Sequence, residues 1–284
     1  MRITFLGAGV FGSALAKIAE YNGHEIRFYD PIKYPELSLQ DTCKSAELIV
    51  FTAPSSASHE ILPKLPKDLP LVCASKGFLS KKPFGGFTDF SALGGAAFAD
   101  EIIAAIQGSA ESTDDSEDDY SQDSKEVTFT VSSPLLEHIF SAEKIKIEYT
   151  DDTLGIMLAG ALKNVYAIGA GLYGDGSVPT SYLESVVSEM SDILEANGAK
   201  KSTLSLSCGV ADLVLSCTPN SRNYRYGSRL NNNINIPQPK SEDLSHETVE
   251  GVSVIGSLKN TPDFIIPESA SIFRDIVSAV KSAE

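Results

Sequence analysis

Hydrophobic and polar positions in the first half of the chain form two patterns that alternate. Short apolar runs bounded by turn residues predict buried strands, and segments with helical periodicity lie between them. The predicted strands are Ile3–Leu6, Glu25–Tyr29, Glu47–Ala53, Leu69–Ala74, Glu126–Val131 and Ile145–Tyr149. Helices are predicted over Val10–Tyr21, over Ser55–Leu65 and from Pro134 onward. Strands that alternate with short helices favour an α/β fold with a parallel, doubly wound sheet.

From Asp151 onward the pattern is helical only. Thr153–Gly171 is apolar on every helical face, which predicts a buried helix. Ser181–Asn197 is amphipathic, and Gly198 follows it as a C-cap. Three further helical segments are predicted near Leu204–Leu215, Glu247–Leu258 and Glu268–Ser282.

This change of pattern places a domain boundary near residue 150. A chain of 284 residues can form two domains, each with its own core. Residues 1–150 are predicted to form the α/β domain, and residues 151–284 an all-helical domain. Within the first domain, residues 109–125 form an acidic, serine-rich segment, predicted to be a solvated surface loop.

Composition and charge narrow the class of protein. The net charge of −15 disfavours nucleic-acid binding, because phosphate contacts need a basic surface. The cysteines have neither a CxxC pair nor nearby histidines, so they are expected to be reduced cytosolic thiols and not a zinc site or disulfide framework. They are Cys43, Cys73, Cys208 and Cys217. The histidines show no pairing that suggests a metal site, and we expect none. Because the first strand begins at once, there is no room for a signal peptide, and we expect a cytoplasmic protein.

A glycine-rich turn joins the first predicted strand to the first helix, with the sequence Gly7-Ala8-Gly9-Val10-Phe11-Gly12. Gly7 permits the tight turn, Gly9 lets a pyrophosphate approach the backbone, and Gly12 lets the helix pack closely on the strand. The helix N-terminus offers N–H groups and a positive dipole end to the phosphates. These features predict a Rossmann-type dinucleotide-binding domain.

Asp30 lies at the end of the second predicted strand. Its carboxylate is placed to accept hydrogen bonds from ribose hydroxyls. The same charge would repel a 2′-phosphate, so we predict NAD as the cofactor, with NADP less favoured.

Lys163 is the only charged residue in the apolar stretch Leu154–Leu172. An ammonium group is costly to bury unless it is compensated, and burial lowers its pKa towards the range useful for proton transfer. The alternative is a lysine whose ammonium reaches solvent at a helix end. A transmembrane segment is disfavoured, because the stretch contains four glycines and this central charge.

Several further segments follow the glycine-rich turn in a defined order. They are Cys73–Phe78 (CASKGF), Gly94–Glu101 (GGAAFADE), Gly160–Val165 (GALKNV), Asp212–Thr218 (DLVLSCT) leading into Ser221-Arg222-Asn223, and Val249-Glu250-Gly251. Together they resemble the NAD(P)-dependent glycerol-3-phosphate dehydrogenase family over nearly the whole chain. The ALKN and SRN segments are the most specific parts of the resemblance. It implies a small phosphorylated substrate and a homodimer.

The resemblance also implies roles for individual residues. Lys163 would be the general acid/base at the C2 oxygen of dihydroxyacetone phosphate, and Lys76 would polarise the carbonyl beside the nicotinamide. Asp212 would hold Lys163 or a substrate hydroxyl, and Arg222 would bind the substrate phosphate, which its planar guanidinium suits. The implied cofactor-binding residues are Gly7, Gly9, Val10, Phe11, Gly12, Asp30, Pro54, Lys76, Ala99, Arg222 and Glu250. The implied substrate-binding residues are Lys76, Gly95, Ala97, Lys163, Asp212, Ser221, Arg222 and Asn223.

Two other functions stay open at this point. One is a related reductase that acts on another small substrate, as in ketopantoate reductases and β-hydroxyacid dehydrogenases. The other is a cofactor-binding sensor or scaffold without catalysis. Ser221-Arg222-Asn223 favours a phosphorylated substrate, and the presence of both Lys76 and Lys163 favours catalysis. Ala97, and the short connection after Asp30, keep the alternatives open.

Overall fold

The computed structural model describes residues 1–107, 126–174, 178–231 and 249–283. The acidic segment 109–125 lies outside the described residues. The chain forms two compact units. Unit 1 comprises Met1–Ala53, Ala57–Ser75 and Lys82–Thr153; unit 2 comprises Pro54–Ser56, Lys76–Lys81 and Leu154–Glu284. Two short segments of the N-terminal half therefore pack with the C-terminal helices.

Unit 1 is built on a seven-stranded sheet with the order β2-β1-β3-β4-β5-β6-β7. The strands are β1 (Arg2–Leu6), β2 (Glu25–Tyr29), β3 (Leu48–Phe51), β4 (Leu71–Cys73), β5 (Phe90–Gly95), β6 (Val127–Val131) and β7 (Ile145–Tyr149). All neighbouring strands run parallel except β5 and β6. The prediction of a parallel sheet is wrong at that one pair, because a buried strand has the same apolar pattern in either direction. Strand β5 was not predicted, because its terminal glycines are typical of a turn.

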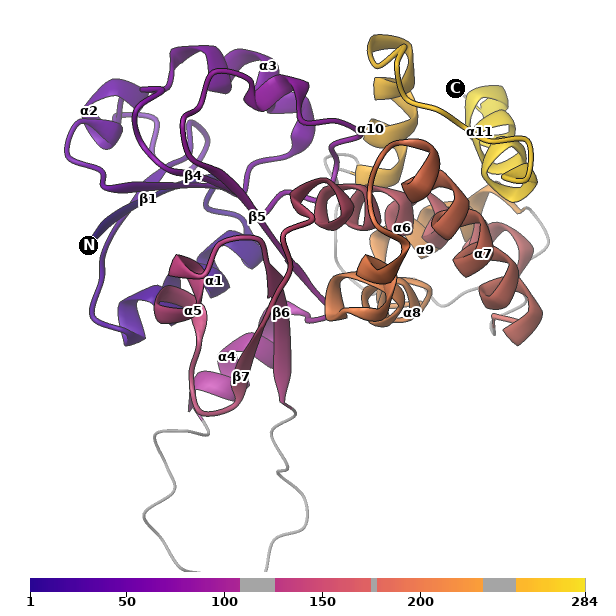
Figure 1. Ribbon diagram of the computed structural model, residues 1–284, viewed down its shortest axis with the longest axis horizontal. Coiled ribbons are helices and arrows are strands. Elements are labelled where there is room, and N and C mark those ends of the chain that lie inside the picture. Colours follow the sequence, from indigo (N-terminus) through magenta and orange to yellow (C-terminus); the bar gives the residue numbers. More distant parts are fainter. Residues whose placement is uncertain (108–125, 175–177, 232–248, 284) are drawn as a thin grey trace, which may run out of the picture. The chain divides into compact units, whose positions relative to one another are not determined.

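Helices cover both faces of this sheet, which makes the fold doubly wound (Figure 1). On one face, α1 (Val10–Tyr21) contacts α4 (Ala99–Gln107) and α5 (Leu135–Phe140). On the other lie α2 (Leu39–Cys43) and α3 (Ser58–Ile61). The helix predicted over Ser55–Leu65 is instead α3 between two 3₁₀ turns. Helices α2 and α4 were not predicted from the sequence.

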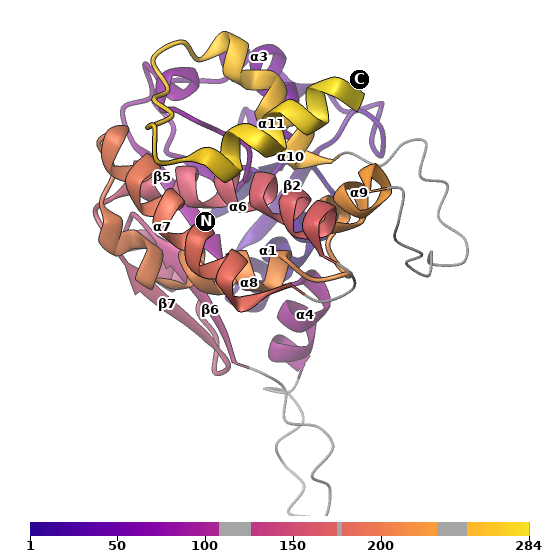
Figure 2. The ribbon, with the colours of Figure 1, turned by 90° about the vertical axis from the view of Figure 1, so that its right-hand side faces the viewer.

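Unit 2 is a helical bundle around α6 (Thr153–Tyr173), which is seen from the side in Figure 2. The helices around it are α7 (Thr180–Ala196), α8 (Asp212–Ser216), α9 (Arg222–Leu230), α10 (Glu250–Ser257) and α11 (Ser271–Ala283). By length and composition α6 could cross a membrane, but 94% of its apolar window is buried inside the protein. The apolar faces of α6 therefore pack against other parts of the protein.

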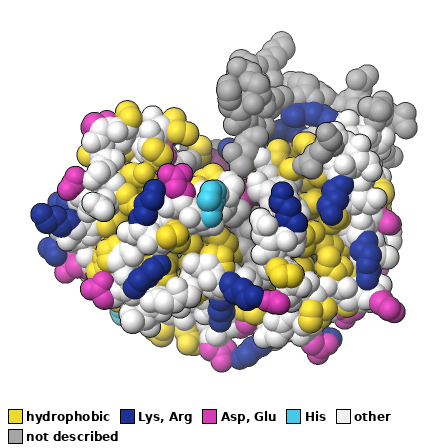
Figure 3. Space-filling model, turned by 90° about the horizontal axis from the view of Figure 1, so that it is seen from above, with side chains coloured by type: hydrophobic (Ala, Val, Ile, Leu, Met, Phe, Trp, Pro, Cys, Tyr) yellow, Lys and Arg dark blue, Asp and Glu magenta, His cyan; other side chains and the backbone are white. Residues whose placement is uncertain are grey.

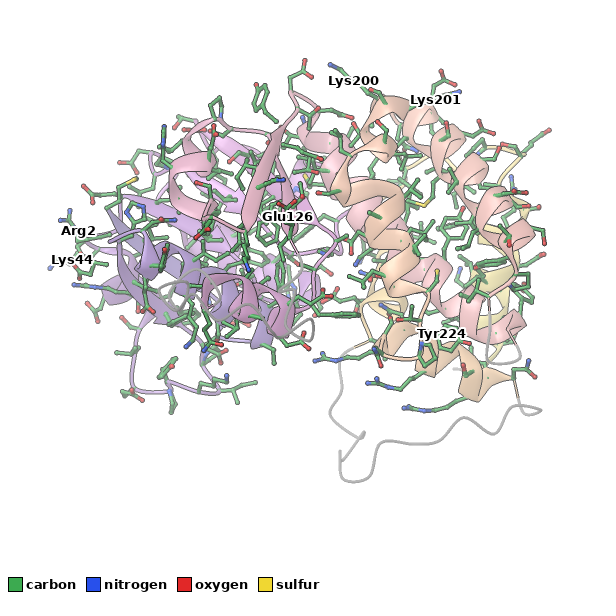
Figure 4. All side chains as sticks on the ribbon, turned by 90° about the horizontal axis from the view of Figure 1, so that it is seen from below. Arg2, Lys44, Glu126, Lys200, Lys201 and Tyr224 are labelled. Atoms are coloured by element: carbon green, nitrogen blue, oxygen red, sulfur yellow. The ribbon has the colours of Figure 1, made fainter. Side chains whose placement is uncertain are left out.

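Helix α9 crosses α6 at very close range. A Cβ atom on Gly227 would lie 1.9 Å from the carbonyl oxygen of Ile168, a distance that no real contact allows. Glycine at this position lets the two backbones touch, and Tyr224 of α9 (Figure 4) is fully buried. Helix α9 was not predicted from the sequence, and Arg222 lies in its first turn.

The segment before α9 consists of several short elements where one helix was predicted. One helix was expected over Leu204–Leu215, but the structure has a 3₁₀ turn at Lys201–Ser205, an irregular turn at Ser207–Ala211 and then α8. The break falls at Gly209, whose ψ of −113° is not helical. This break allows Asp212 to begin a separate short helix.

The surface carries interspersed charge. On the face in Figure 3, basic side chains stand singly among acidic, polar and apolar ones. Lys200 and Lys201 follow α7 (Figure 4), and the ammonium of Lys201 lies 2.8 Å from Glu195 and 3.9 Å from Asp192. Exposed pairs of this kind contribute little to stability.

Glu189 of α7 anchors the start of α11. Its Oε1 accepts hydrogen bonds from Ile272 N (2.8 Å) and the Ser271 hydroxyl (3.3 Å). Its Oε2 accepts them from Phe273 N (3.0 Å) and the Tyr166 hydroxyl (2.9 Å). A buried carboxylate is thereby compensated by the free N–H groups of a helix N-terminus. Burial, together with the Glu189 charge, raises the pKa of Tyr166 well above its usual range.

Glu189→Gln is expected to destabilise the protein by about 1–3 kcal/mol, because the amide NH₂ group turns a donor towards helix N–H donors. Thermal and urea unfolding followed by circular dichroism measure the change. The matched control is Glu184→Gln on the exposed face of the same helix, which should stay within about 0.5 kcal/mol of wild type. Equal unfolding midpoints for the two variants would show that Glu189 does not anchor α11.

Candidate active site

The glycine-rich turn of unit 1 has the geometry that a dinucleotide requires. Gly7 has a φ of +109°, and a Cβ on it would lie 2.7 Å from Ala53 N. A Cβ on Gly12 would lie 2.7 Å from the carbonyl oxygen of Gly7. Gly9, at the N-cap of α1, has no other group within 4 Å of a Cβ position. The turn is thus packed tightly on its inner side and open above Gly9, where a pyrophosphate would approach the backbone.

Thr52 holds this turn against the sheet. Its hydroxyl lies 2.8 Å from the carbonyl oxygen of Gly7 and 3.1 Å from that of Leu6. Strands β1 and β3 are neighbours, and β2 lies on the other side of β1. The turn therefore lies at the point where the strand order reverses, the usual ligand position in such sheets. Thr52 was missed because a single threonine after a strand carries no distinctive pattern.

Asp30 lies beside the same turn, after the end of β2. Its Oδ2 accepts a hydrogen bond from Ala8 N (2.9 Å), and its Oδ1 accepts from Ile32 N (3.0 Å) and Lys33 N (3.1 Å). Burial alone would raise the pKa of Asp30. The three backbone N–H groups and the charge of Lys33 outweigh it, so the pKa lies below its usual value.

In unit 2, a buried carboxylate joins two lysines. Lys163, on α6, donates to Asp212 Oδ1 at 2.5 Å and to the Ser216 hydroxyl at 2.8 Å. Lys76 donates to Asp212 Oδ2 at 2.8 Å. The Asp212 side chain is 2% exposed, that of Lys163 8% and that of Lys76 17%. The sequence-predicted residues Lys76, Lys163 and Asp212 are therefore brought together, and Lys163 is buried.

This arrangement sets the acidity of Lys163. Burial lowers its pKa to about 8, with the neighbouring Lys76 charge acting in the same direction and Asp212 opposing both. A lysine in this range can give or take a proton near neutral pH. Ser216, the further partner of Lys163, was missed in the sequence, although it lies one helical turn after Asp212 on α8.

A chain of amides fixes the position of Lys76. Asn164 Nδ2 donates to the carbonyl oxygen of Lys76 (2.8 Å), and Asn223 Nδ2 donates to Asn164 Oδ1 (2.9 Å). The backbone N–H of Gly251 donates to Asn223 Oδ1 (2.9 Å). This chain connects the Lys76 segment with α6, α9 and α10. Asn164 was not predicted as a site residue, because its role depends on contacts distant in sequence.

Glu250 begins α10 and lies against the segment Pro54–Ser56. Its Oε2 accepts a hydrogen bond from the Ser55 hydroxyl at 3.3 Å. Burial raises the pKa of Glu250, while Ser55 and the charge of Arg222 act against the rise. Arg222 and Glu250 thus interact electrostatically at the starts of α9 and α10, and Ser221 is the N-cap of α9.

Gly95, Ala97 and Ala99, also predicted as substrate or cofactor residues, belong to unit 1. Gly95 ends β5, where a Cβ would lie 2.6 Å from the carbonyl oxygen of Thr128 on β6, so strand packing also requires glycine. Ala97 is buried, and Ala99 begins α4. Among the described residues, no group of three or more His, Cys, Asp or Glu side chains could hold a metal ion. The four cysteines are all buried, and none of them forms a disulfide.

The similarity to known proteins covers residues of both units. Residues 152–277 match the family described as NAD-dependent glycerol-3-phosphate dehydrogenase C-terminus. The glycerol-3-phosphate dehydrogenase [NAD(P)+] of Shewanella frigidimarina is 30% identical over 273 residues, which cover 80% of this chain and 77% of that protein. That of Shewanella pealeana is 29% identical, covering 88% of this chain and 82% of that protein. The crystal structure of the enzyme from Coxiella burnetii has a TM-score of 0.75 at 20% identity, covering 99% of this chain and 98% of that chain.

The doubly wound sheet, the glycine-rich turn and the buried Lys163–Asp212–Lys76 cluster are those of a dinucleotide-dependent oxidoreductase with a helical second unit. The similarity to the Shewanella proteins then specifies the family. The chain belongs to the NAD(P)-dependent glycerol-3-phosphate dehydrogenase family.

Proposed function

We propose that the protein interconverts dihydroxyacetone phosphate and sn-glycerol 3-phosphate, with NAD as the preferred cofactor. The observation that carries this proposal is the Lys163–Asp212–Lys76 cluster, in which a buried lysine has a pKa of about 8. Such a group is suited to move a proton at a carbonyl oxygen.

The hydride that adds to C2 of the substrate would come from a bound nicotinamide cofactor. Lys163 gives its Nζ proton to the C2 oxygen as the C=O π bond breaks, so an alcohol forms and no free alkoxide is released. In the reverse direction, the neutral amine of Lys163 takes the hydroxyl proton. Lys76 places a second ammonium near the same oxygen and stabilises its developing negative charge.

Asp212 makes this cluster stable in the ground state. Two ammonium groups that share one carboxylate would otherwise repel each other in a site with little water. Asp212 holds both nitrogen atoms by hydrogen bonds of 2.5 and 2.8 Å. Asp212 and Ser216 therefore direct the Lys163 ammonium, while Asn164 holds the backbone of Lys76.

We assign the binding site of the substrate phosphate to the start of α9. Arg222 is exposed there, and its guanidinium suits the paired oxygens of a phosphate. Ser221 and Asn223 flank it. Both polar atoms of the Asn223 side-chain amide already have protein partners, so we assign Asn223 mainly to holding the start of α9 against α6 and α10. A protein of net charge −15 needs such local cations to attract a dianion.

The remaining cofactor contacts are proposed on the family resemblance. They are Gly7, Gly9, Val10, Phe11, Gly12, Asp30 and Ala99 in unit 1, and Pro54, Lys76, Arg222 and Glu250 in unit 2. Gly95 and Ala97 are proposed on the same basis to lie near the substrate. We also propose a cytoplasmic homodimer; light scattering on the purified chain measures the oligomeric state.

A steady-state assay tests the proposed function. Purified protein with NADH and dihydroxyacetone phosphate should consume NADH, and ketopantoate should be a poor substrate. Faster turnover of ketopantoate than of dihydroxyacetone phosphate would show that the protein acts as one of the related reductases. Intact NADH binding with no turnover of either substrate would make it a non-catalytic cofactor-binding protein.

The pH dependence of the same assay reports on Lys163. Reduction needs the protonated lysine, so kcat/KM for dihydroxyacetone phosphate should be level below the pKa of about 8 and fall above it. The fall should be about tenfold per pH unit, because it follows the loss of one proton. Oxidation of glycerol 3-phosphate needs the neutral amine, so its kcat/KM should rise with pH through the same region. Profiles that are flat from pH 6 to about pH 10 in both directions would exclude Lys163 as the proton donor.

A further inference from the structure

We infer that a cavity in unit 1 binds a small amphipathic anion, which has an apolar body and one anionic head group. The cavity has a volume of about 480 Å³, within the range of about 300–1,000 Å³ that is usual for small-molecule sites. It is lined by α2 and by residues 64–66, which follow α3, so all of it belongs to unit 1. No residue of this lining is part of the candidate active site, and the inference does not depend on the proposed function.

The cavity lies at the edge of the sheet where the parallel strands begin. Lys44 comes shortly before β3, and Pro66 comes shortly before the neighbouring strand β4. Figure 4 shows Lys44 at the same end of unit 1 as Arg2, the first residue of β1. The glycine-rich turn follows the last residue of β1, so it lies at the opposite edge of the sheet. The cavity is therefore separate from the proposed dinucleotide site.

The floor of the cavity is apolar. It is formed by the buried side chains of Leu39, Cys43 and Leu65, and Pro66 adds a further apolar surface. Burial raises the pKa of Cys43 to about 11, so its thiol is neutral at physiological pH and behaves as a small apolar group. A ligand with an apolar body would gain free energy here, because it removes this surface from water.

Two exposed lysines, Lys44 and Lys64, stand at the rim of the cavity. Within the described residues, the Lys44 ammonium makes no hydrogen bond or ion pair. The Lys64 ammonium lies 3.4 Å from a Glu60 oxygen in an exposed pair, which holds it only weakly. Asp41, the acidic residue of the lining, accepts the Ser38 hydroxyl at 2.6 Å. The rim therefore offers two ammonium groups to an anionic head group.

The overall charge of the protein makes these two lysines decisive. At a net charge of −15, the protein as a whole repels anions, so affinity for an anion must come from local cations. Hydrogen bonds between an ammonium and a carboxylate are stronger than those between neutral groups. The cavity therefore favours a ligand that combines an apolar body with a negative head group over a neutral ligand of the same shape.

The experiment is an NMR titration of the isotope-labelled full chain with octanoate, and with 1-octanol as a neutral ligand of the same chain length. Octanoate should shift the amide signals of residues 39–44 and 64–65 in a saturable way, with a Kd of about 1 mM or tighter. Octanol should bind at least about fivefold more weakly, because it lacks the charged head group. An excess of NADH should change the Kd for octanoate by less than about twofold, since the glycine-rich turn is at the opposite edge.

A charge-reversal variant and a matched control complete the test. Lys44→Glu should raise the Kd for octanoate by about tenfold, as loss of a charged hydrogen bond does. Lys17→Glu reverses another exposed lysine of unit 1 and should change this Kd by less than about twofold. Both lysines are exposed, so both variants are expected to fold.

Four results would each overturn the inference. They are the absence of saturable shifts at residues 39–44, displacement of octanoate by NADH, equal affinity for octanoate and octanol, and equal weakening by Lys44→Glu and Lys17→Glu. A loss of octanoate affinity confined to Lys44→Glu, with the shifts at the cavity, supports it.

Discussion

Replacing Lys163 with methionine is expected to lower kcat for dihydroxyacetone phosphate reduction by about 100- to 10,000-fold, the usual contribution of a positioned general acid. Methionine has a similar length and no ionisable proton, so it fills the space in α6 without serving as a donor. Asp212 keeps Lys76 as its partner, so the variant is expected to fold. The Kd for NADH should stay within about threefold of wild type, because the glycine-rich turn is in unit 1.

Two variants complete this experiment. Lys163→Arg keeps the charge but has a pKa too high to release a proton, so it should be nearly as inactive as Lys163→Met. Lys201→Met removes an exposed lysine after α7 and should retain full activity. An active Lys163→Met protein would show that Lys163 has only a structural role.

Replacing Asp212 with asparagine is expected to lower kcat by about 100-fold or more, and to move the pH profile as well. The amide oxygen can accept from one ammonium only, and the NH₂ group would face the other. Two positive charges would then share a buried site without a carboxylate, which lowers the pKa of Lys163 below its wild-type value of about 8. The fall in kcat/KM for reduction should therefore begin at a lower pH than in wild type.

Asp192→Asn is the matched control, because Asp192 also lies near a lysine of unit 2, but its side chain is 37% exposed where that of Asp212 is 2% exposed. It should leave both the rate and the pH profile unchanged. A loss of rate in Asp212→Asn without a downward shift of the profile would mean that Asp212 does not set the acidity of Lys163. Thermal unfolding of each variant separates a loss of fold from a loss of chemistry.

Local signals were sufficient for most of the fold. The strands at Glu25–Tyr29 and Ile145–Tyr149 and the helix at Val10–Tyr21 have the predicted bounds, because their apolar patterns and their turn residues agree. Two of the missed elements have conflicting local signals: β5 ends in glycines, and α9 begins in a polar segment rich in arginine. In both cases partner elements distant in sequence stabilise a structure that local preference disfavours.

The sequence by itself predicted the change from an α/β to a helical pattern near residue 150, the glycine-rich turn with Asp30, and the presence of one charged residue in an apolar helix. These features depend on composition and on spacing over short distances, which a sequence displays directly. The tertiary structure decided what Lys163 contacts, because Asp212 and Ser216 are 49 and 53 residues away along the chain. It also decided how Asp30 is compensated and how three amides hold Lys76. Such contacts depend on the packing of whole helices, and the acidity of a buried group depends on every charge around it.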